Sequence, residues 1–400
     1  TTTIDNEQKT LNVPNLRFPE FEGEWEECKL GDVAMVVGGG TPDTNNHKYW
    51  NGDIQWFTPS EIGRDKYVTN SLRTISEEGL NKSSAKLLPI GTILLSSRAT
   101  VGECSINKVE CTTNQGFQSL IPKEYFSKEF VFYLMQTKRK ELIRKSCGST
   151  FLEISANEVR KIKIAVPTSK EQEKISKLLA LLDERISTQN KIIEDLKKLK
   201  STIIDYAIGS LDTNFMKFGS VYETAREGGT PTTSNTSFYN NGKIPFIKIG
   251  DLKQKYLIEN KDFITELGLQ KSSAWLVPTH SILFSNGATI GEITITTYPV
   301  CTKQGILGIV PKANIDVEFL YYFMSSSYFK KAVSRIITEG TMKTAYLRDI
   351  DNILCPIPTK EKQLKIAKVP SALNLKIDSE QSILRLLYAQ KQYLLHQMFR

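Results

Sequence analysis

The sequence predicts an α+β protein in which two similar globular domains are joined by two long antiparallel coiled-coil helices, as a pseudo-two-fold dumbbell. Three observations lead to this fold class: the chain repeats itself, each copy begins with short β-type runs and turn signals, and each copy closes with a long heptad segment. A length of 400 residues is enough for two or three domains.

The internal duplication is the most informative feature of the chain. Residues 80–106 and 269–295 are identical at 15 of 27 positions, at a constant offset of 189. The match continues, at offsets of 189–191, in three further pairs of segments: 39–42 with 228–231, 115–116 with 304–305, and 166–175 with 357–366. A unit of about 190 residues is far too long for a solenoid repeat, so the chain is predicted to hold two domains of one kind.

Each copy opens with a stretch of mixed β and α signals. Short apolar runs after a Pro-containing turn predict buried strands at 93–95 and 282–284. The Asn-Gly dipeptides at 51–52 and 241–242 predict hairpin turns, because both central residues of such a turn need a positive φ. Helical spacing with basic residues on the polar side predicts two further helices, at 128–145 and 316–337.

Each copy then closes with a long helix. Apolar residues recur at three-and-four spacing over residues 170–208, which is typical of a coiled coil. The second copy has the same pattern, and Pro370 is expected to kink or restart its helix. Neither helix can bury its apolar stripe alone, so we expect the two to pair. The predicted division is a lead (1–24), a globular domain (25–168), a central spacer helix (169–209), a linker (210–216), a second globular domain (217–359) and a distal spacer helix (360–400).

Charge and composition narrow the function. The formal net charge is +8, yet residues 1–32 hold eight acidic and three basic side chains, so the rest of the chain is strongly basic. A basic body favours a polyanionic partner such as nucleic acid. Neither a membrane-spanning run nor a secretory signal is present, and the six cysteines form no Cys-x-x-Cys pair. We therefore expect reduced thiols and a cytoplasmic protein without a membrane association.

Catalytic motifs are missing from the sequence. The three histidines have no spacing that would make them metal ligands with carboxylates or cysteines, so we predict no metal site. The glycine-rich stretch 33–42 lacks the G-x-G-x-x-G spacing and a following lysine, and is interpreted as a tight turn. No nucleophile has an evident base. The chain is expected to bind rather than to catalyse.

The ordered motifs resemble a known family. The lead NLRFPEFEGEWEECKLGDVA (15–34), the paired Gly-Gly-Thr-Pro loops, the segment Ile-Leu-x-Ser-x-x-Ala-Thr-x-Gly-Glu and the Pro-Thr-x-Lys-Glu entry to each heptad helix follow one another, and all but the lead occur twice. Over essentially its whole length, the chain is similar to the specificity (S) subunits of type I restriction–modification enzymes, of a staphylococcal kind.

The resemblance implies a non-catalytic DNA-recognition subunit. Its two target-recognition domains would each read one half of a bipartite double-stranded DNA target, and the helices would set the unread gap. Two modification (M) subunits would dock on the helices and supply S-adenosylmethionine and adenine methylation. Restriction (R) subunits would add ATP- and Mg-dependent translocation and cleavage, so this chain would itself bind no cofactor. Because the two copies diverge in their polar loops, we expect an asymmetric target.

Residues for DNA contact are predicted from polar positions in the loops and at the ends of basic helices. Arg98 is suited to guanine or phosphate and Asn286 to adenine, although such side chains can equally shape a turn. Gln115 and Gln304 are retained in both copies and are expected to serve shared structure. The predicted DNA-binding set is Thr44, Asn45, Asn46, Lys48, Ser97, Arg98, Lys145, Ser149, Thr233, Ser234, Asn235, Asn286, Lys303, Thr341 and Lys343.

The helices are also predicted to carry a partner surface. In a two-stranded coiled coil, the apolar side chains of Leu179, Ile186 and Ile193 would be left partly uncovered, which suits docking of an M subunit. Two alternatives stay open on the sequence: a coiled-coil scaffold whose globular ends bind protein or carbohydrate, and a stand-alone enzyme such as a nuclease. Salt-dependent DNA affinity argues against the scaffold, and cleavage by the chain alone would favour the enzyme.

Overall fold

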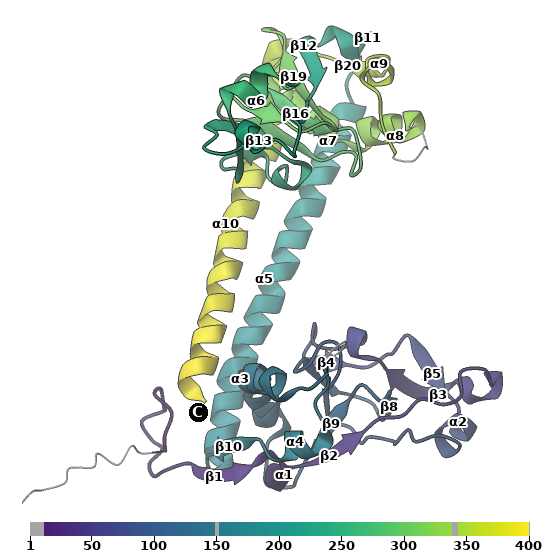
Figure 1. Ribbon diagram of the computed structural model, residues 1–400, viewed down its shortest axis with the longest axis vertical. Coiled ribbons are helices and arrows are strands. Elements are labelled where there is room, and N and C mark those ends of the chain that lie inside the picture. Colours follow the sequence, from purple (N-terminus) through teal and green to yellow (C-terminus); the bar gives the residue numbers. More distant parts are fainter. Residues whose placement is uncertain (1–11, 149–151, 338–342, 400) are drawn as a thin grey trace, which may run out of the picture. The chain divides into compact units, whose positions relative to one another are not determined.

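A computed structural model describes residues 12–148, 152–337 and 343–399 of the chain. The chain divides into two compact units: unit 1 comprises residues 1–188 and 383–400, and unit 2 comprises residues 189–382. Each unit holds one globular domain together with a segment of each of the two long helices (Figure 1).

The globular domain of unit 1 is built on two sheets and one further strand pair. A five-stranded sheet has the order β2-β9-β6-β7-β4, a three-stranded sheet has the order β5-β3-β8, and β1 pairs with β10. The elements are β1 (Glu26–Lys29), α1 (Leu30–Val33), β2 (Ala34–Gly38), β3 (Trp50–Phe57), β4 (Tyr67–Val68), β5 (Arg73–Ile75), α2 (Glu77–Asn81), β6 (Ile93–Leu95), β7 (Cys104–Asn107), β8 (Cys111–Thr113), β9 (Gln118–Pro122), α3 (Lys128–Lys145), α4 (Ala156–Arg160) and β10 (Lys163–Val166).

Unit 2 repeats this topology strand for strand. Its five-stranded sheet has the order β12-β19-β16-β17-β14, its three-stranded sheet has the order β15-β13-β18, and β11 pairs with β20. The elements are β11 (Phe215–Lys217), β12 (Tyr222–Glu227), β13 (Ile244–Ile247), β14 (Tyr256–Leu257), β15 (Asp262–Ile264), α6 (Glu266–Gln270), β16 (Ile282–Ser285), β17 (Ile293–Thr296), β18 (Cys301–Thr302), β19 (Ile306–Pro311), α7 (Val317–Ser325), α8 (Ser327–Ile336), α9 (Leu347–Ile350) and β20 (Leu354–Pro356). The predicted duplication is therefore confirmed at the level of the fold.

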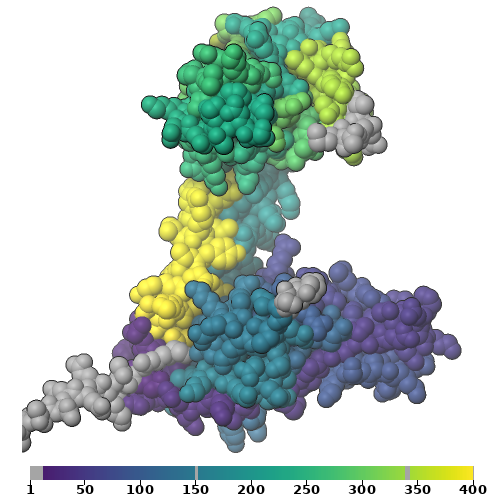
Figure 2. All heavy atoms as spheres, in the orientation of Figure 1, coloured from purple at the N-terminus to yellow at the C-terminus, as the bar shows by residue number. Residues whose placement is uncertain are grey.

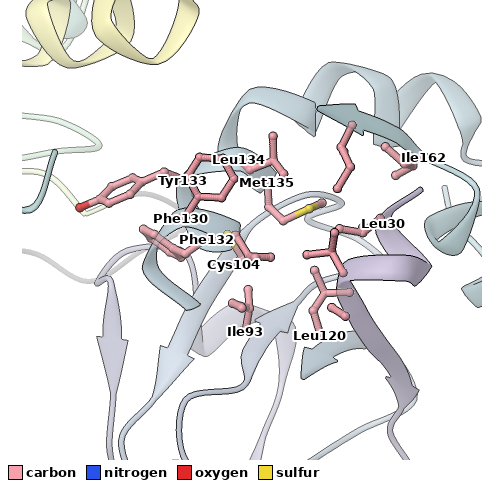
Figure 3. Packing of buried hydrophobic residues seen from close by; sticks show 14 of the residues in the cluster. Leu30, Ile93, Cys104, Leu120, Phe130, Phe132, Tyr133, Leu134, Met135 and Ile162 are labelled. Carbon is pink, nitrogen blue, oxygen red and sulfur yellow. The ribbon is translucent and has the colours of Figure 1, made fainter. Parts of the chain in front are cut away.

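The main core of each unit lies between the five-stranded sheet and the helix that follows it. In unit 1, Phe130, Leu134 and Met135 of α3 belong to one buried cluster with Ile93 and Leu120 of the sheet (Figure 3). All of these side chains are buried. The buried strands predicted from the apolar runs at 93–95 and 282–284 are therefore observed, as short strands covered on both faces.

Two long helices close the fold, α5 (Ser169–Gly209) and α10 (Lys360–Met398). In unit 1, Leu182 and Ile186 of α5 pack with Leu387 of α10. In unit 2, the Lys200 ammonium donates to Asn374 Oδ1 at 2.7 Å. As residue numbers rise along α5 they fall along α10, so the helices are antiparallel, as predicted.

The ends of the long helices complete the cores of the domains. Ile204 and Ile208 of α5 are buried in the core of unit 2. The equivalent residues of the second copy, 191 positions later in the sequence, are Leu395 of α10 and Phe399 just after it. Both are buried in the core of unit 1. Figure 2 shows this end of α10, in yellow, against the N-terminal segment of the same unit. Each domain is therefore covered by the end of a helix that belongs to the other copy of the sequence.

Neither Asn-Gly dipeptide forms the predicted hairpin, although Asn241 lies in a turn that the Gly242 N–H closes by donating to the Tyr239 carbonyl at 3.0 Å. Asn51 does have a positive φ of 61°, and Asn241 one of 59°. However, Asn51 and Gly52 lie inside β3, where the register with β5 shifts between Trp50 and Ile54, so they form a bulge. A Cβ on Gly52 would lie 2.5 Å from Ser76 Cα, so this position needs glycine because two backbones approach each other.

Two helix predictions also need correction. The helix expected over 316–337 is split into α7 and α8, because Ser326 adopts an extended backbone and its side chain accepts a hydrogen bond from the Phe329 N–H to start a new helix. Pro370 does not restart the distal helix, since α10 continues through it. Ile366 and Ala367, one turn earlier, pack on the core of unit 2. We attribute the continuity to this burial, which offsets the loss of one backbone hydrogen bond.

Candidate DNA interface

The first pair of predicted loops is anchored by glycines and presents polar side chains. Cβ atoms on Gly39 and Gly228 would lie 2.0 and 2.2 Å from the carbonyl oxygens of Asn114 and Thr302, so both loops start where backbones touch. Beyond these glycines, all but one of the nominated side chains are exposed: Thr44, Asn45, Lys48, Thr233, Ser234 and Asn235. The loops at 41–48 and 230–237 are therefore accessible from solvent, and their contact with DNA stays a prediction.

Two asparagines in these loops also have a structural task. The Asn46 side chain is partly covered and accepts a hydrogen bond from the Lys48 N–H at 3.1 Å, which starts the 3-10 turn η1 (His47–Tyr49). Asn235 does the same for the Ser237 N–H at 3.1 Å, at the start of η4 (Thr236–Phe238). Their amide groups hold the loops in shape, and direct base contact by either residue stays a prediction. Trp50, which follows the first loop, packs in a small apolar cluster with Trp56 and Ile75.

One candidate was missed from the sequence. The Arg73 guanidinium lies 3.6 Å from the ring centre of Trp50, and Arg73 is exposed on β5 beside the first loop. Stacking on an aromatic ring holds an arginine in place while its donors stay available. The position 189 residues later is Asp262, which pairs with the Lys248 ammonium at 2.8 Å. Only strand pairing brings Arg73 to the tryptophan, so a sequence motif could not reveal it.

The Ser-x-x-Ala-Thr segments are placed differently from the expectation. Ser97 has 0% and Asn286 2% of its surface exposed. The Asn286 Nδ2 donates to the Ala345 carbonyl at 3.3 Å. These two side chains serve the interior of their loops and do not reach DNA in this conformation. A short polar side chain can serve either in DNA contact or inside a loop. The segments that fold over Ser97 and Asn286 decide that both are buried.

Arg98 is half-exposed and already has a partner. Its guanidinium donates to Glu153 Oε2 from Nη2 at 2.7 Å and from Nε at 3.1 Å. The residues that follow, Ala99 and the equivalent Ala288, have φ values of 63° and 54°. Such a backbone is uncommon for alanine, so it is a shared structural feature of the two domains. DNA contact by Arg98 stays a prediction, and it would compete with Glu153.

The remaining nominated residues are lysines and loop hydroxyls. Lys145 lies 3.3 Å from Glu141 within α3 and is partly covered. Lys303 and Lys343 are exposed. Ser149 and Thr341 lie outside the described residues.

The predicted partner surface on the helices is wrong in its residues. Leu179, Ile186 and Ile193 are all buried. Leu179 lies in the core of unit 1, and Ile186 packs with Leu387 of α10. The exposed apolar side chains follow other stripes of the two helices. On α5 these are Leu181, Ile192, Leu199 and Tyr206, and on α10 they are Leu364, Val369, Leu375, Ile383, Leu386, Tyr388 and Tyr393. On α5, spacings of seven and eleven residues keep the set on one helix face.

Metal and membrane chemistry find no support in the part of the chain that the structure describes. Within that part, His, Cys, Asp and Glu side chains form no group of three that could hold a metal ion. None of its helices is long and apolar enough to cross a bilayer. All six cysteines are free, and burial raises the pKa of the Cys104 thiol to about 12, which makes it a poor nucleophile.

The fold and these surfaces define a class of protein: a duplicated domain with polar, divergent loops, held on paired helices. The family model described as the type I restriction modification DNA specificity domain matches residues 22–198 and again residues 211–387. The chain therefore belongs to the family of type I restriction enzyme specificity subunits.

Individual relatives agree with this assignment. The chain is 30% identical over 368 residues to the type I restriction enzyme MjaIX specificity subunit of Methanocaldococcus jannaschii, with 85% of each chain covered. It is 31% identical over 190 residues to the EcoR124I/EcoR124II specificity subunit of Escherichia coli, with 46% of each covered. The S subunit of a type I restriction–modification system of M. genitalium shares the fold at a TM-score of 0.57 and 17% identity, over 97% of this chain and 99% of that one.

Proposed function

We propose that this chain is the DNA-recognition subunit of a type I restriction–modification complex and reads an asymmetric bipartite target with one half-site per domain. The observation that carries the proposal is the duplication of one scaffold with different chemistry at equivalent surface positions. At an offset of 189, Lys48 corresponds to Ser237, Arg73 to Asp262 and Asn114 to Lys303. Two domains with the same fold and different donors and acceptors are suited to two different base sequences.

The residues proposed to meet DNA are the exposed members of the nominated set together with Arg73. Exposed lysines such as Lys48, Lys303 and Lys343 fit phosphate contact, which positions a protein on DNA without reading its sequence. Thr44, Asn45, Thr233 and Ser234 fit groove contacts. The target bases follow from loop geometry and bound water as well as from residue type.

The helices are proposed to hold two M subunits. The exposed stripes on α5 and α10 leave large apolar side chains in water, and a helix from a partner would cover them. We assign S-adenosylmethionine and methyl transfer to those M subunits, and ATP and Mg to R subunits that join them. On this basis the chain itself binds no cofactor and acts in the cytoplasm.

The proposal is tested by co-expression of the chain with its M subunit in a host free of adenine methylation, followed by long-read mapping of methyladenine. The expected result is one asymmetric bipartite motif. Replacing residues 41–48 with 230–237 should alter one half-site and leave the other unchanged. A stable complex that methylates no bipartite motif would contradict the proposed function.

A further inference from the structure

A partly buried polar cluster joins the sheet, the covering helix and at least one long helix within each unit, and the DNA-reading function does not use it. In unit 1 it comprises Lys66, Tyr133, Asp183 and Lys391; in unit 2 it comprises Lys255, Glu318, Tyr322 and Ser371. We call these the anchor clusters. Lys66, Tyr67, Glu129 and Tyr133 recur 189 residues later as Lys255, Tyr256, Glu318 and Tyr322. The duplication has therefore kept four polar or charged residues at the base of both domains.

The anchor cluster of unit 1 is a chain of hydrogen bonds across four elements. Lys66 immediately precedes β4, and its ammonium donates to the Tyr133 hydroxyl of α3 at 2.9 Å. That hydroxyl donates to Asp183 Oδ2 of α5 at 2.6 Å. The ammonium of Lys391 on α10 lies 2.7 Å from Asp183 Oδ1. One continuous path links the edge of the sheet to both long helices.

The anchor cluster of unit 2 joins the covering helix α7 and the long helix α10 with different groups. The Lys255 side chain is 3% exposed, and its ammonium lies 3.0 Å from Glu318 Oε2 of α7. It also donates to Ser371 Oγ of α10 at 2.9 Å. The Tyr322 hydroxyl of α7 lies 3.1 Å from the same Ser371 oxygen. Position 374 holds Asn374, the counterpart of Asp183, and it accepts from Lys200 of α5.

The lysines are fixed at both ends. The Lys66 carbonyl accepts from the Ile106 N–H of β7 at 2.7 Å, and the Lys255 carbonyl accepts from the Ile295 N–H of β17 at 2.8 Å. Burial lowers the pKa of both ammonium groups, and the nearby carboxylates partly offset this shift because their negative charge favours the protonated lysine. A buried charge is costly unless its partners are held in place, so each cluster permits few orientations of the domain on its helices.

We propose that the anchor clusters set the orientation of each recognition domain on its helices, and that they thereby determine which gap between half-sites is accepted. Lys66, Tyr133 and Asp183, with Lys255, Glu318 and Tyr322, are positioning residues that act on DNA through the loops. This inference rests on the proposed function. Apolar packing alone would tolerate small rotations of a domain, whereas a directional hydrogen-bond path does not.

The test compares methylation of the mapped target with methylation of duplexes whose gap is one base pair longer or shorter. The complex of the full chain with its M subunits is used. The Tyr133→Phe and Tyr322→Phe variants keep the ring and remove the hydroxyl, and Tyr125→Phe is the matched control at an exposed tyrosine of unit 1. We expect the rate on altered gaps, relative to the mapped target, to rise roughly tenfold in Y133F and Y322F and to stay unchanged in Y125F.

The rate ratio separates positioning from folding, since a loss of folded protein lowers methylation of all three duplexes equally. An unchanged ratio in Y133F and Y322F, or an equal rise in Y125F, overturns the inference. Asp183→Asn, which installs the residue of the second copy, is the further variant. If none of these variants assembles with M subunits, the clusters serve folding and the inference fails. If the wild-type complex methylates no bipartite target, the proposed function fails instead.

Discussion

The two units share one fold but differ in how the polypeptide is tied to the start of the closing helix. In unit 1 the N-terminal segment crosses this point, where Arg17 pairs with Glu171 of α5 at 2.8 Å and the Trp25 indole donates to the same carboxylate at 3.2 Å. In unit 2 the equivalent of Glu171 is Lys362, which is exposed. In unit 2 the chain enters the domain directly from the end of α5, so the entering segment is tied to a long helix by the polypeptide itself. In unit 1 the entering segment is tied to a long helix by the ion pair.

The comparison also separates what the duplication kept from what it changed. The Gln172 side chain accepts a hydrogen bond from the N–H of Ser127, the N-cap of α3, at 3.0 Å. The Gln363 side chain likewise accepts from the N–H of Asp316, the N-cap of α7, at 2.8 Å. By contrast, Arg73 and Asp262 differ in charge on equivalent strands. The contacts between domain and long helix are therefore the same in the two copies, whereas the surface proposed to face DNA differs between them. The residues that hold the domain on its helix are not the residues proposed to recognise DNA.

The largest expected difference between the units concerns Glu171. Its side chain is 1% exposed and that of Arg17 16%. Glu171→Ala leaves the Arg17 guanidinium and the Trp25 indole without their acceptor, and should destabilise unit 1 by about 3 kcal/mol. Lys362→Ala should change unit 2 by less than about 0.5 kcal/mol. Hydrogen exchange of peptides from α3 and α7 reports each unit separately. Equal effects of the two variants would show that the N-terminal segment is not a specific tie.

A smaller difference is expected at the lysines that close the helix pair. Lys391→Met removes the ammonium beside Asp183 and leaves a partly covered carboxylate, at a cost of about 2 kcal/mol to unit 1. Lys200→Met removes a donor from the neutral Asn374 amide and should cost unit 2 about 0.5 kcal/mol. The same exchange measurement checks both values. A larger cost for K200M would invert the comparison.

On the DNA side, the units should differ in salt dependence at equivalent positions. Lys303 is exposed, whereas the Asn114 side chain accepts from the Gly116 N–H at 2.9 Å. Lys303→Ala should reduce the slope of log Kd against log salt by about 0.9, the value for one phosphate contact. Asn114→Ala should leave the slope unchanged. Titrations of the complex with M subunits at several salt concentrations measure both slopes. An unchanged slope in K303A would remove Lys303 from the interface.

The smallest expected effect is acid sensitivity in unit 2. Burial raises the pKa of Glu318, but hydrogen bonds from Ser371, Tyr256 and Lys255 outweigh it, and the net pKa lies below its usual 4.5. A carboxylate with a lowered folded pKa contributes stability above its usual pKa and loses it as the pH falls below that value toward the folded pKa. Thermal melts should show a smaller acid loss in Glu318→Gln than in the wild type. A parallel loss in both proteins would contradict this assignment.

Much of the architecture was predictable from the sequence because it rests on local periodicity and on repetition. The buried strands at 93–95 and 282–284, the long helices and their need to pair follow from apolar spacing. The site was less predictable. Loop residues such as Thr44 and Lys48 are exposed as expected, but Ser97 and Asn286 are buried. A short polar side chain reads the same in a surface loop and in a buried one, so only the segments packed over it decide its role.

The sequence by itself determined that this is a duplicated protein with two long paired helices, since a repeat and a heptad pattern are properties of the chain alone. The order of its motifs added the resemblance to the DNA-specificity family. The tertiary structure decided which side chains are available. It buried Leu179, Ile186 and Ile193, stacked Arg73 on Trp50 and carried α10 through Pro370. It also assembled the anchor clusters, each of which spans more than 100 positions of the chain. These outcomes depend on long-range packing, which residue spacing along the chain does not specify.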